Sequence, residues 1–254
     1  MEQASFLKNK TSLTDGMQVS GLTLIKSCTK KTTTTGKPFL TGEISTSDGI
    51  IGYKVWDSSA VFPALAQVLA EKGEVTGVGI DLLGKIDMFG GKPAVIITGG
   101  ELSLNIDKTI FMPKRYDAQD MINKLFSTVQ PNLTEKGNNL LNVILWQNSE
   151  VLNRFSVQFA AKANHDNCLC GLVAHTYKVT RLMVDTINMY PDVLNLRGMN
   201  REDAKDLLII GATLHDIGKI MEMDYGEYLP DSVVTHRILG LDYLFENKQL
   251  IVDS

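Results

Sequence analysis

Hydrophobic and polar residues alternate with a period of two in residues 38–46 and 50–56, and the rest of residues 17–100 outside one helical stretch has the composition and turn signals of β-strands. The pattern predicts strands at residues 17–27, 38–46, 50–56, 74–83 and 92–98. Between the third and fourth strands, residues 61–72 have helical spacing instead. Three strands, a helix and two strands is the order of an OB-fold, a small five-stranded barrel that commonly binds single-stranded nucleic acid.

From about residue 117 the apolar residues recur every three or four positions, which indicates amphipathic helices. Helices are predicted at residues 117–129, 133–146, 151–163, 171–190 and 201–214, and a further one begins near Val233. Asn200 is a predicted N-cap, and Pro191 ends the helix before it. We therefore predict an α+β chain of two domains. An OB-fold β-barrel occupies residues 1–104, a connector with the first helix residues 105–130, and an all-α domain residues 131–254.

The composition is that of a folded protein of the cytosol. The 254 residues are 44% hydrophobic and 21% charged, and they contain neither a secretory signal nor an apolar run long enough for a membrane span. Three cysteines are too few for a disulfide scaffold, so we expect a reducing, cytoplasmic compartment. The net charge of −4 divides into +1 for residues 1–100 and −5 for residues 101–254. Residues 1–100 can therefore bind a polyanion, and residues 101–254 are acidic, as a metal-binding part would be.

All four histidines lie in the second half of the chain. His215 and Asp216 close an apolar helix and are followed by Gly218 and Lys219, while His175 can supply a further ligand from an earlier helix. Such a mixed imidazole and carboxylate set suits a transition metal that activates water. The alternative is that these histidines are core or surface residues with no shared task.

A second string of possible ligands is His165 with Cys168 and Cys170. A zinc site would need a fourth ligand and usually a different cysteine spacing, so buried reduced thiols are favoured.

The run Leu214–Lys219, with Ala174-His175-Thr176 upstream, resembles the HD superfamily of metal-dependent phosphohydrolases. Together with the predicted barrel, the chain resembles the YhaM-type 3′–5′ exoribonucleases, which join an OB-fold to an HD domain. Residues 36–40, 51–57 and 159–165 also carry this resemblance.

The resemblance implies a role for each matching residue. His175, His215 and Asp216 match metal ligands, and Lys219, which with Asp216 forms the catalytic pair, matches a lysine that contacts the substrate phosphate. His236 matches a histidine that serves a second metal, although Thr235 stands where the family has glycine. The cofactor is a divalent ion, manganese before cobalt, iron or magnesium.

His165 lies where the family has a His-His pair, whose second member here is Asp166. It is ranked below the other histidines for this reason.

The family pattern continues to a Ser-His-His-Gly run and a final Asp on a later helix, and neither precedes Ser254. The HD domain is therefore expected to be C-terminally shortened, with weak metal binding and low hydrolysis. An apolar face of Ile238, Leu241 and Leu244 is expected to be covered by another subunit or a partner chain.

Nucleic-acid contacts are predicted in the barrel. Residues 26–37 are interpreted as a basic loop, and the alternation of the neighbouring strands turns aromatic and basic side chains outward. The candidate contacts are Lys30, Lys31, Lys37, Phe39, Lys54 and Trp56. The alternatives are an ordinary solvated loop and packing of these side chains against the helical half.

Three functions follow from these features. The first is a metal-dependent 3′–5′ exonuclease of single-stranded RNA or DNA, working as a homo-oligomer or with a partner chain. The second is a phosphohydrolase of small nucleotides. The third is a single-strand-binding protein with a degenerate HD domain. The first is preferred because the ligand-type residues are present.

Overall fold

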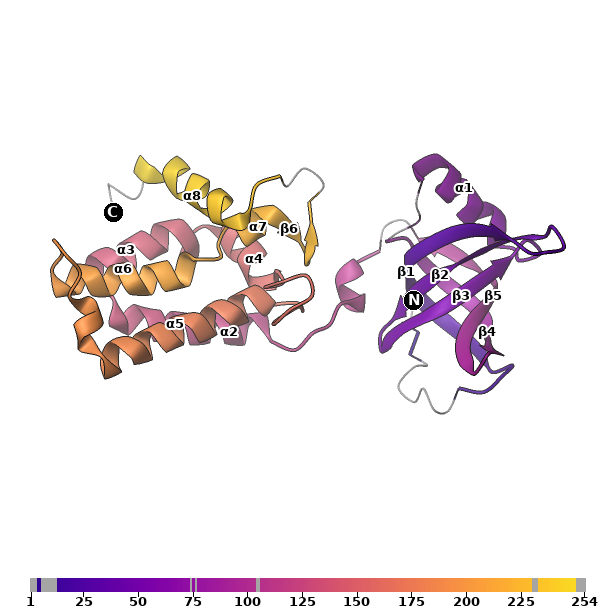
Figure 1. Ribbon diagram of the computed structural model, residues 1–254, viewed down its shortest axis with the longest axis horizontal. Coiled ribbons are helices and arrows are strands. Elements are labelled where there is room, and N and C mark those ends of the chain that lie inside the picture. Colours follow the sequence, from indigo (N-terminus) through magenta and orange to yellow (C-terminus); the bar gives the residue numbers. More distant parts are fainter. Residues whose placement is uncertain are drawn as a thin grey trace. The chain divides into compact units, whose positions relative to one another are not determined.

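The structure, a computed structural model, describes residues 4–5, 13–73, 75, 77–103, 106–229 and 233–249. It divides into two compact units, Met1–Met112 and Pro113–Ser254, each with its own hydrophobic core (Figure 1). Among the described residues, no helix has the length and apolar character needed to cross a bilayer. The finer domain limits drawn from the sequence stay a prediction.

The first unit is a closed barrel with the strand order β1-β2-β3-β5-β4. Strands β3 and β5 pair in parallel, and all other neighbouring strands of the barrel are antiparallel. Helix α1 lies between β3 and β4 in sequence, which gives the order predicted for an OB-fold. The elements are β1 (Gln18–Thr32), β2 (Pro38–Thr46), β3 (Gly49–Trp56), α1 (Phe62–Lys72), β4 (Gly79–Phe89) and β5 (Lys92–Ser103). The predicted strand at residues 74–83 instead begins at Gly79, and Glu74 lies outside the described residues.

The alternation predicted for β2 and β3 is confirmed by burial. Leu40, Ile44, Tyr53 and Val55 are at most 1% exposed and fill the barrel. A bulge between Ile25 and Ser27 bends β1, and a Cβ on Gly42 would lie 1.9 Å from the Ser27 carbonyl oxygen. Glycine at this position therefore lets the two strands approach closely where the barrel bends.

The interpretation of residues 26–37 as a basic loop is wrong. β1 continues to Thr32, and only the turn at residues 33–37 connects it to β2, closed by the Thr33 N–H donating to the Lys37 carbonyl at 2.9 Å. Lys30 pairs with Leu40 and Lys31 with Phe39 in the antiparallel register. Lysine and threonine side chains gave no hydrophobic alternation here, but the backbone still completes its hydrogen bonds by pairing with β2.

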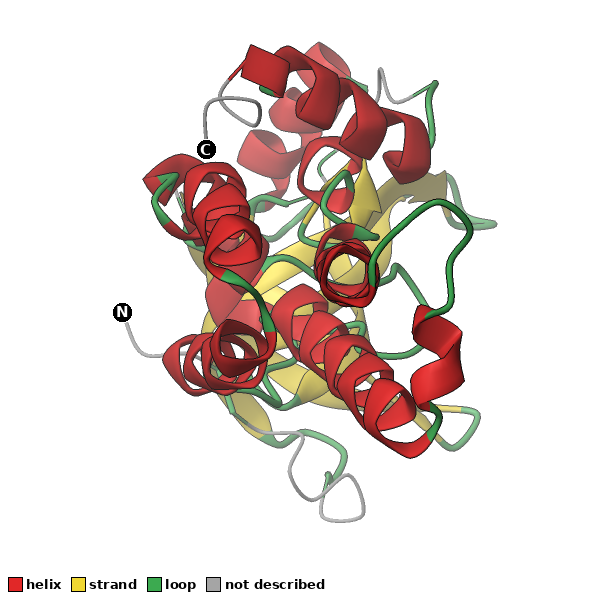
Figure 2. Cartoon of the chain, turned by 90° about the vertical axis from the view of Figure 1, so that its left-hand side faces the viewer, coloured by secondary structure: helices red, strands yellow, loops and turns green. Residues whose placement is uncertain are grey.

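The second unit is helical, and Figure 2 shows its helices in red. Its elements include α2 (Ala118–Val129), α3 (Glu135–Leu141), α4 (Ser149–Val157), α5 (Gly171–Met189), α6 (Arg201–Leu214), α7 (Lys219–Glu222) and α8 (His236–Glu246). A π-helical turn, Asn142–Trp146, follows α3, and short 3₁₀ turns occur at Lys108–Phe111 in the first unit and at Gln130–Asn132 and Pro191–Leu194 in the second. Strands β6 (Met223–Asp224) and β7 (Glu227–Tyr228) form a small hairpin.

Local sequence explains most of these helix ends. Asn200 caps α6, as predicted, with its side chain accepting from the Asp203 N–H at 2.8 Å. The predicted helix at residues 151–163 ends earlier, at Val157, and residues 158–170 form a loop. In that loop the buried Gln158 side chain donates to the Met223 carbonyl at 2.7 Å and accepts from the Gly226 N–H at 3.2 Å. These hydrogen bonds tie the loop to the β6–β7 hairpin.

The apolar face predicted on α8 is only partly present. Ile238 and Leu241 are 51% and 55% exposed, but Leu244 packs against the helical core. Tyr243, also on α8, is buried and donates to the Ile144 carbonyl at 2.6 Å. The helix is therefore anchored to the rest of its unit through the side that carries Tyr243 and Leu244.

Candidate metal centre

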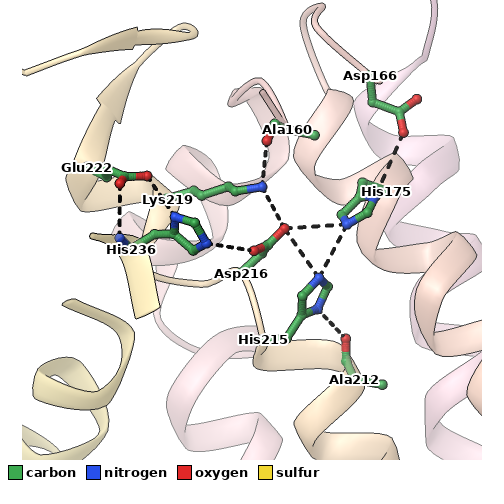
Figure 3. A network of polar contacts seen from close by, with 9 residues as sticks. All are labelled: Ala160, Asp166, His175, Ala212, His215, Asp216, Lys219, Glu222 and His236. Carbon is green, nitrogen blue, oxygen red and sulfur yellow. Dashed lines mark hydrogen bonds and ion pairs between the residues drawn. The ribbon is translucent and has the colours of Figure 1, made fainter. Parts of the chain in front are cut away.

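Three donor atoms from two parts of the helical unit lie close enough together to bind one ion (Figure 3). His175 comes from the first turns of α5, and His215 and Asp216 come from the turn that follows α6. The Nε2 atoms of the two histidines are 3.3 Å apart. Asp216 Oδ2 is 3.4 Å from Nε2 of His175 and 3.3 Å from Nε2 of His215.

The spacing of these donors fits a single divalent ion. Ligands that each lie about 2.1 Å from an ion are about 3.0–3.4 Å apart when they subtend angles of about 90–109°. The donor separations of 3.3–3.4 Å match one triangular face of such a coordination shell. The combination of two imidazoles and one carboxylate is also a set that transition metals prefer.

The tautomer of His215 favours the same conclusion. Its Nδ1 lies 2.9 Å from the Ala212 carbonyl oxygen, which can only accept a hydrogen bond. The proton of the neutral ring therefore sits on Nδ1, and the lone pair of Nε2 is directed to His175 and Asp216. Metal-bound histidines are typically held by this kind of contact to their other ring nitrogen.

The carboxylate at the centre is ionised and tightly held. Burial raises the pKa of Asp216, but its contacts with the protonated form of His215 and with Lys219 outweigh burial and hold the pKa well below its usual value. Lys219 Nζ lies 2.7 Å from Asp216 Oδ2 and 2.6 Å from the Ala160 carbonyl oxygen. The lysine predicted to contact a phosphate thus stands beside the three donor atoms.

The pKa values of His175 and His215 are shifted in opposite directions. Burial lowers the pKa of His175, with Asp216 acting against it, so its ring is held in the neutral form that binds metals. When the ring of His215 is protonated, Nε2–H can donate to Asp216, and this raises the pKa of His215, although burial opposes it. Protons therefore compete with a metal for this centre mainly at His215.

The fourth predicted ligand, His236, approaches the same carboxylate from its other side. Its Nε2 lies 3.4 Å from Asp216 Oδ1 (Figure 3). Thr235, which replaces the glycine of the family pattern, is the N-cap of α8 and does not prevent this approach. The structure thus brings together all the histidines and the aspartate predicted as metal ligands.

His165, ranked lowest from the sequence, also lies at this centre. Its ring is exposed and stands against that of His175, with the ring centroids 4.7 Å apart. Cys168 and Cys170 are free, buried thiols, and burial raises the pKa of both.

Two carboxylates next to the centre were missed as functional residues. Asp166 accepts hydrogen bonds from Tyr116 Oη at 2.6 Å and Lys178 Nζ at 2.7 Å, and its Oδ2 lies 3.9 Å from His175 Nδ1. Glu222 contacts His236. A signal for Glu222 was present, since it follows Lys219 by three residues and so stays close to it in a helical turn. The sequence carries no such signal for Asp166, because a loop brings this residue to the centre.

In the barrel, the aromatic residues predicted to face outward form a pair. Phe39 and Trp56 are half-buried cross-strand neighbours with ring centroids 5.1 Å apart. The register places Lys31 on the same rung and face as Phe39, whereas Lys30 points to the opposite face. Lys54, two residues before Trp56 in β3, shares the face of the aromatic pair, and Lys37 is exposed in the turn before β2.

Fold and site together define an OB-type barrel joined to an HD domain. Comparison with protein families identifies the family described as HD domain at residues 172–252, the part that contains His175, His215, Asp216 and His236. HD domains bind divalent metals and include metal-dependent hydrolases.

The resemblance to YhaM-type exoribonucleases is also confirmed. The chain is 29% identical to the 3′-5′ exoribonuclease YhaM of Oceanobacillus iheyensis over 214 residues, which are 83% of this chain and 61% of that relative. Two crystal structures of the mitochondrial single-stranded DNA binding protein Rim1 from S. cerevisiae match 37% of this chain and all of theirs. They are 16% identical to it, with TM-scores of 0.28 and 0.29. The assignment of the barrel rests on its own strand order.

Proposed function

We propose that this chain is a metal-dependent phosphodiesterase that degrades single-stranded RNA from its 3′ end. The observation that carries the proposal is the triangle of donor atoms from His175, His215 and Asp216, with Lys219 beside it, within an HD domain. The YhaM relative, an exoribonuclease by name, supports RNA as the substrate. Manganese is the first candidate ion, before cobalt, iron and magnesium, since imidazole and carboxylate ligands together suit it.

In this proposal the helical unit carries the chemistry. His175, His215 and Asp216 would hold a divalent ion, and His236 would hold a second one against the other oxygen of Asp216. When bound, such an ion activates water and neutralises charge on a phosphate. Lys219 uses two of its three N–H donors for Asp216 and the Ala160 carbonyl, so the third can donate to a phosphate oxygen.

The barrel would hold the strand without reading its sequence. Phe39 and Trp56 offer ring faces for base stacking, which contributes about 1–3 kcal/mol per base. Lys31, on the same face as this pair, would contact a phosphate, and Lys37 and Lys54 would extend the basic surface. Lys30 is given no contact in this proposal because its side chain points to the other face of the sheet.

The test is a nuclease assay on 5′-labelled single-stranded RNA and on DNA of the same sequence, with Mn²⁺ and with EDTA. We expect a ladder of products shortened from the 3′ end, formed from RNA with Mn²⁺ only. Asp216→Asn should reduce hydrolysis to the EDTA level, because it removes a ligand and its charge. Asp242→Asn, at an exposed position on α8, is the matched control and should keep full activity.

Two results would contradict the proposal. Hydrolysis of free nucleotides without action on strands would indicate a small-nucleotide phosphohydrolase. Strand binding with no hydrolysis under any metal would indicate a binding protein.

A further inference from the structure

Glu222 is a buried carboxylate that the proposed function leaves without a role. It is 7% exposed and ends the short helix α7, three residues after Lys219. Both of its oxygens contact one residue, His236. Oε1 accepts from the His236 backbone N–H at 3.1 Å, and Oε2 lies 2.9 Å from His236 Nδ1 (Figure 3).

This contact fixes which ring nitrogen of His236 carries the proton. An ionised carboxylate can only accept hydrogen bonds, so Nδ1 must be the donor. In the neutral ring Nε2 then has a free lone pair. Nε2 is the atom that faces Asp216, 3.4 Å from Oδ1, so the lone pair points to where a metal would lie.

The backbone of Glu222 is itself held in place. Its N–H donates to the Gly218 carbonyl at 3.0 Å, and its carbonyl accepts from the Leu229 N–H at 3.0 Å. The start of α8 also packs directly on Gly218, where a Cβ would lie 1.9 Å from the His236 carbonyl oxygen. Glu222 and His236 are therefore brought together by fixed backbone on both sides.

Asp216 presents its two oxygens to different groups. Oδ2 faces His175, His215 and Lys219, and Oδ1 faces His236. We propose that Glu222 is a positioning residue: it holds His236 as the Nδ1–H tautomer, with Nε2 prepared to share a second metal ion with Asp216. This inference rests on the proposed function, since it concerns the second metal position of the same centre.

The first test needs no variant and no metal. The ¹⁵N shifts of the His236 ring in the wild-type chain show which nitrogen keeps the proton when the ring is neutral. We expect Nδ1. A proton on Nε2 would overturn the proposal.

The second test replaces Glu222 with glutamine. The amide oxygen can still accept from the His236 backbone N–H, but the amide nitrogen can only donate to Nδ1. Glu222→Gln should therefore move the ring proton to Nε2 and block that atom as a ligand. Titration with Mn²⁺, followed by the EPR signal of the free ion, should show the second equivalent bound about 10–100-fold more weakly and the first unchanged.

Glu227→Gln is the matched control. Glu227 is an exposed glutamate of the nearby hairpin that pairs with Lys162 at 2.7 Å, so the control makes the same chemical change without touching His236. It should leave the tautomer and both Mn²⁺ equivalents as in the wild type. A purely structural role for Glu222 would lower the melting temperature of Glu222→Gln without moving the ring proton, and would overturn the proposal.

The wild-type titration separates this inference from the proposed function. If the wild-type chain binds no Mn²⁺, the proposed function fails, and so does the claim that His236 serves a second metal. The claim that Glu222 sets the tautomer of His236 is then decided by the ¹⁵N shifts alone. If it binds one equivalent and hydrolyses RNA, the proposed function stands and the inference is overturned.

Discussion

Replacing Gly218 with alanine is expected to push α8 away from the metal centre. The φ angle of Gly218 is −62°, which any residue adopts, so the requirement for glycine is one of space. A Cβ would lie 1.9 Å from the His236 carbonyl oxygen and 2.6 Å from the Gly240 nitrogen, where ordinary contact begins at 3.4 Å. Since both neighbours are backbone atoms, the start of α8 must move by about 1.5 Å, and overpacking of this kind costs about 1–3 kcal/mol.

The displacement should lower the free energy of unfolding and weaken only one of the two metal positions. Urea unfolding of Gly218→Ala should give a free energy of unfolding lower by the amount above. Because His175 and His215 lie on other elements, the first Mn²⁺ equivalent should remain while the second, which needs His236, weakens.

Gly211→Ala supplies the matched control for this prediction. Gly211 lies inside α6 with no atom within 4 Å of a built Cβ. The same substitution there should stabilise the chain by about 0.5–1 kcal/mol, since alanine is the better helix former. If Gly218→Ala kept the wild-type unfolding free energy and bound two full equivalents, the reasoning from close packing would be refuted.

Three further predictions concern the loop carboxylate and the barrel surface. Burial raises the pKa of Asp166, but hydrogen bonds from Lys178 and Tyr116 lower it by more, so the pKa in the folded state is below its usual value. The contribution to stability is therefore present above the unfolded value of about 3.9 and is lost as the pH falls below it; the unfolding free energies of wild type and Asp166→Asn should differ at pH 7 and converge in acid. In RNA binding, Lys31→Ala should reduce the slope of log affinity against log salt by about one unit, while Lys30→Ala should not. Trp56→Ala should weaken binding by about 1–3 kcal/mol per stacked base with little change in that slope, and equal salt slopes and affinities for all these variants would move the binding face elsewhere.

The barrel could be predicted because its strands alternate cleanly. Leu40, Tyr53 and Val55 fill its core as the period of two requires. The basic segment was misread as a loop since lysine and threonine carry no hydrophobic signal, and only pairing with β2 shows that it is a strand. For the same reason Lys30 and Lys31 could not be assigned to opposite faces before the register was known.

The metal centre was predictable where its residues are close in sequence or match a known pattern. His215 and Asp216 are adjacent, and His175 lies in a recognisable run. Asp166 could not be assigned a role in this way, because a loop brings it to the centre. The spacing of Glu222 from Lys219 places it near the centre, but its contact with His236 depends on how α8 packs. Sequence periodicity carries no information about either contact.

The hydrogen bonds of Gln158 have a consequence for local opening of the protein. They join residues 65–68 positions apart, linking the loop after α4 to the β6–β7 hairpin. That loop also carries the Ala160 carbonyl, which holds Lys219. Local unfolding of the hairpin must break the Gln158 bonds, and we expect it to loosen the loop that holds the lysine as well. We therefore expect the amides of the loop and the hairpin to exchange with solvent through a shared opening rather than one by one.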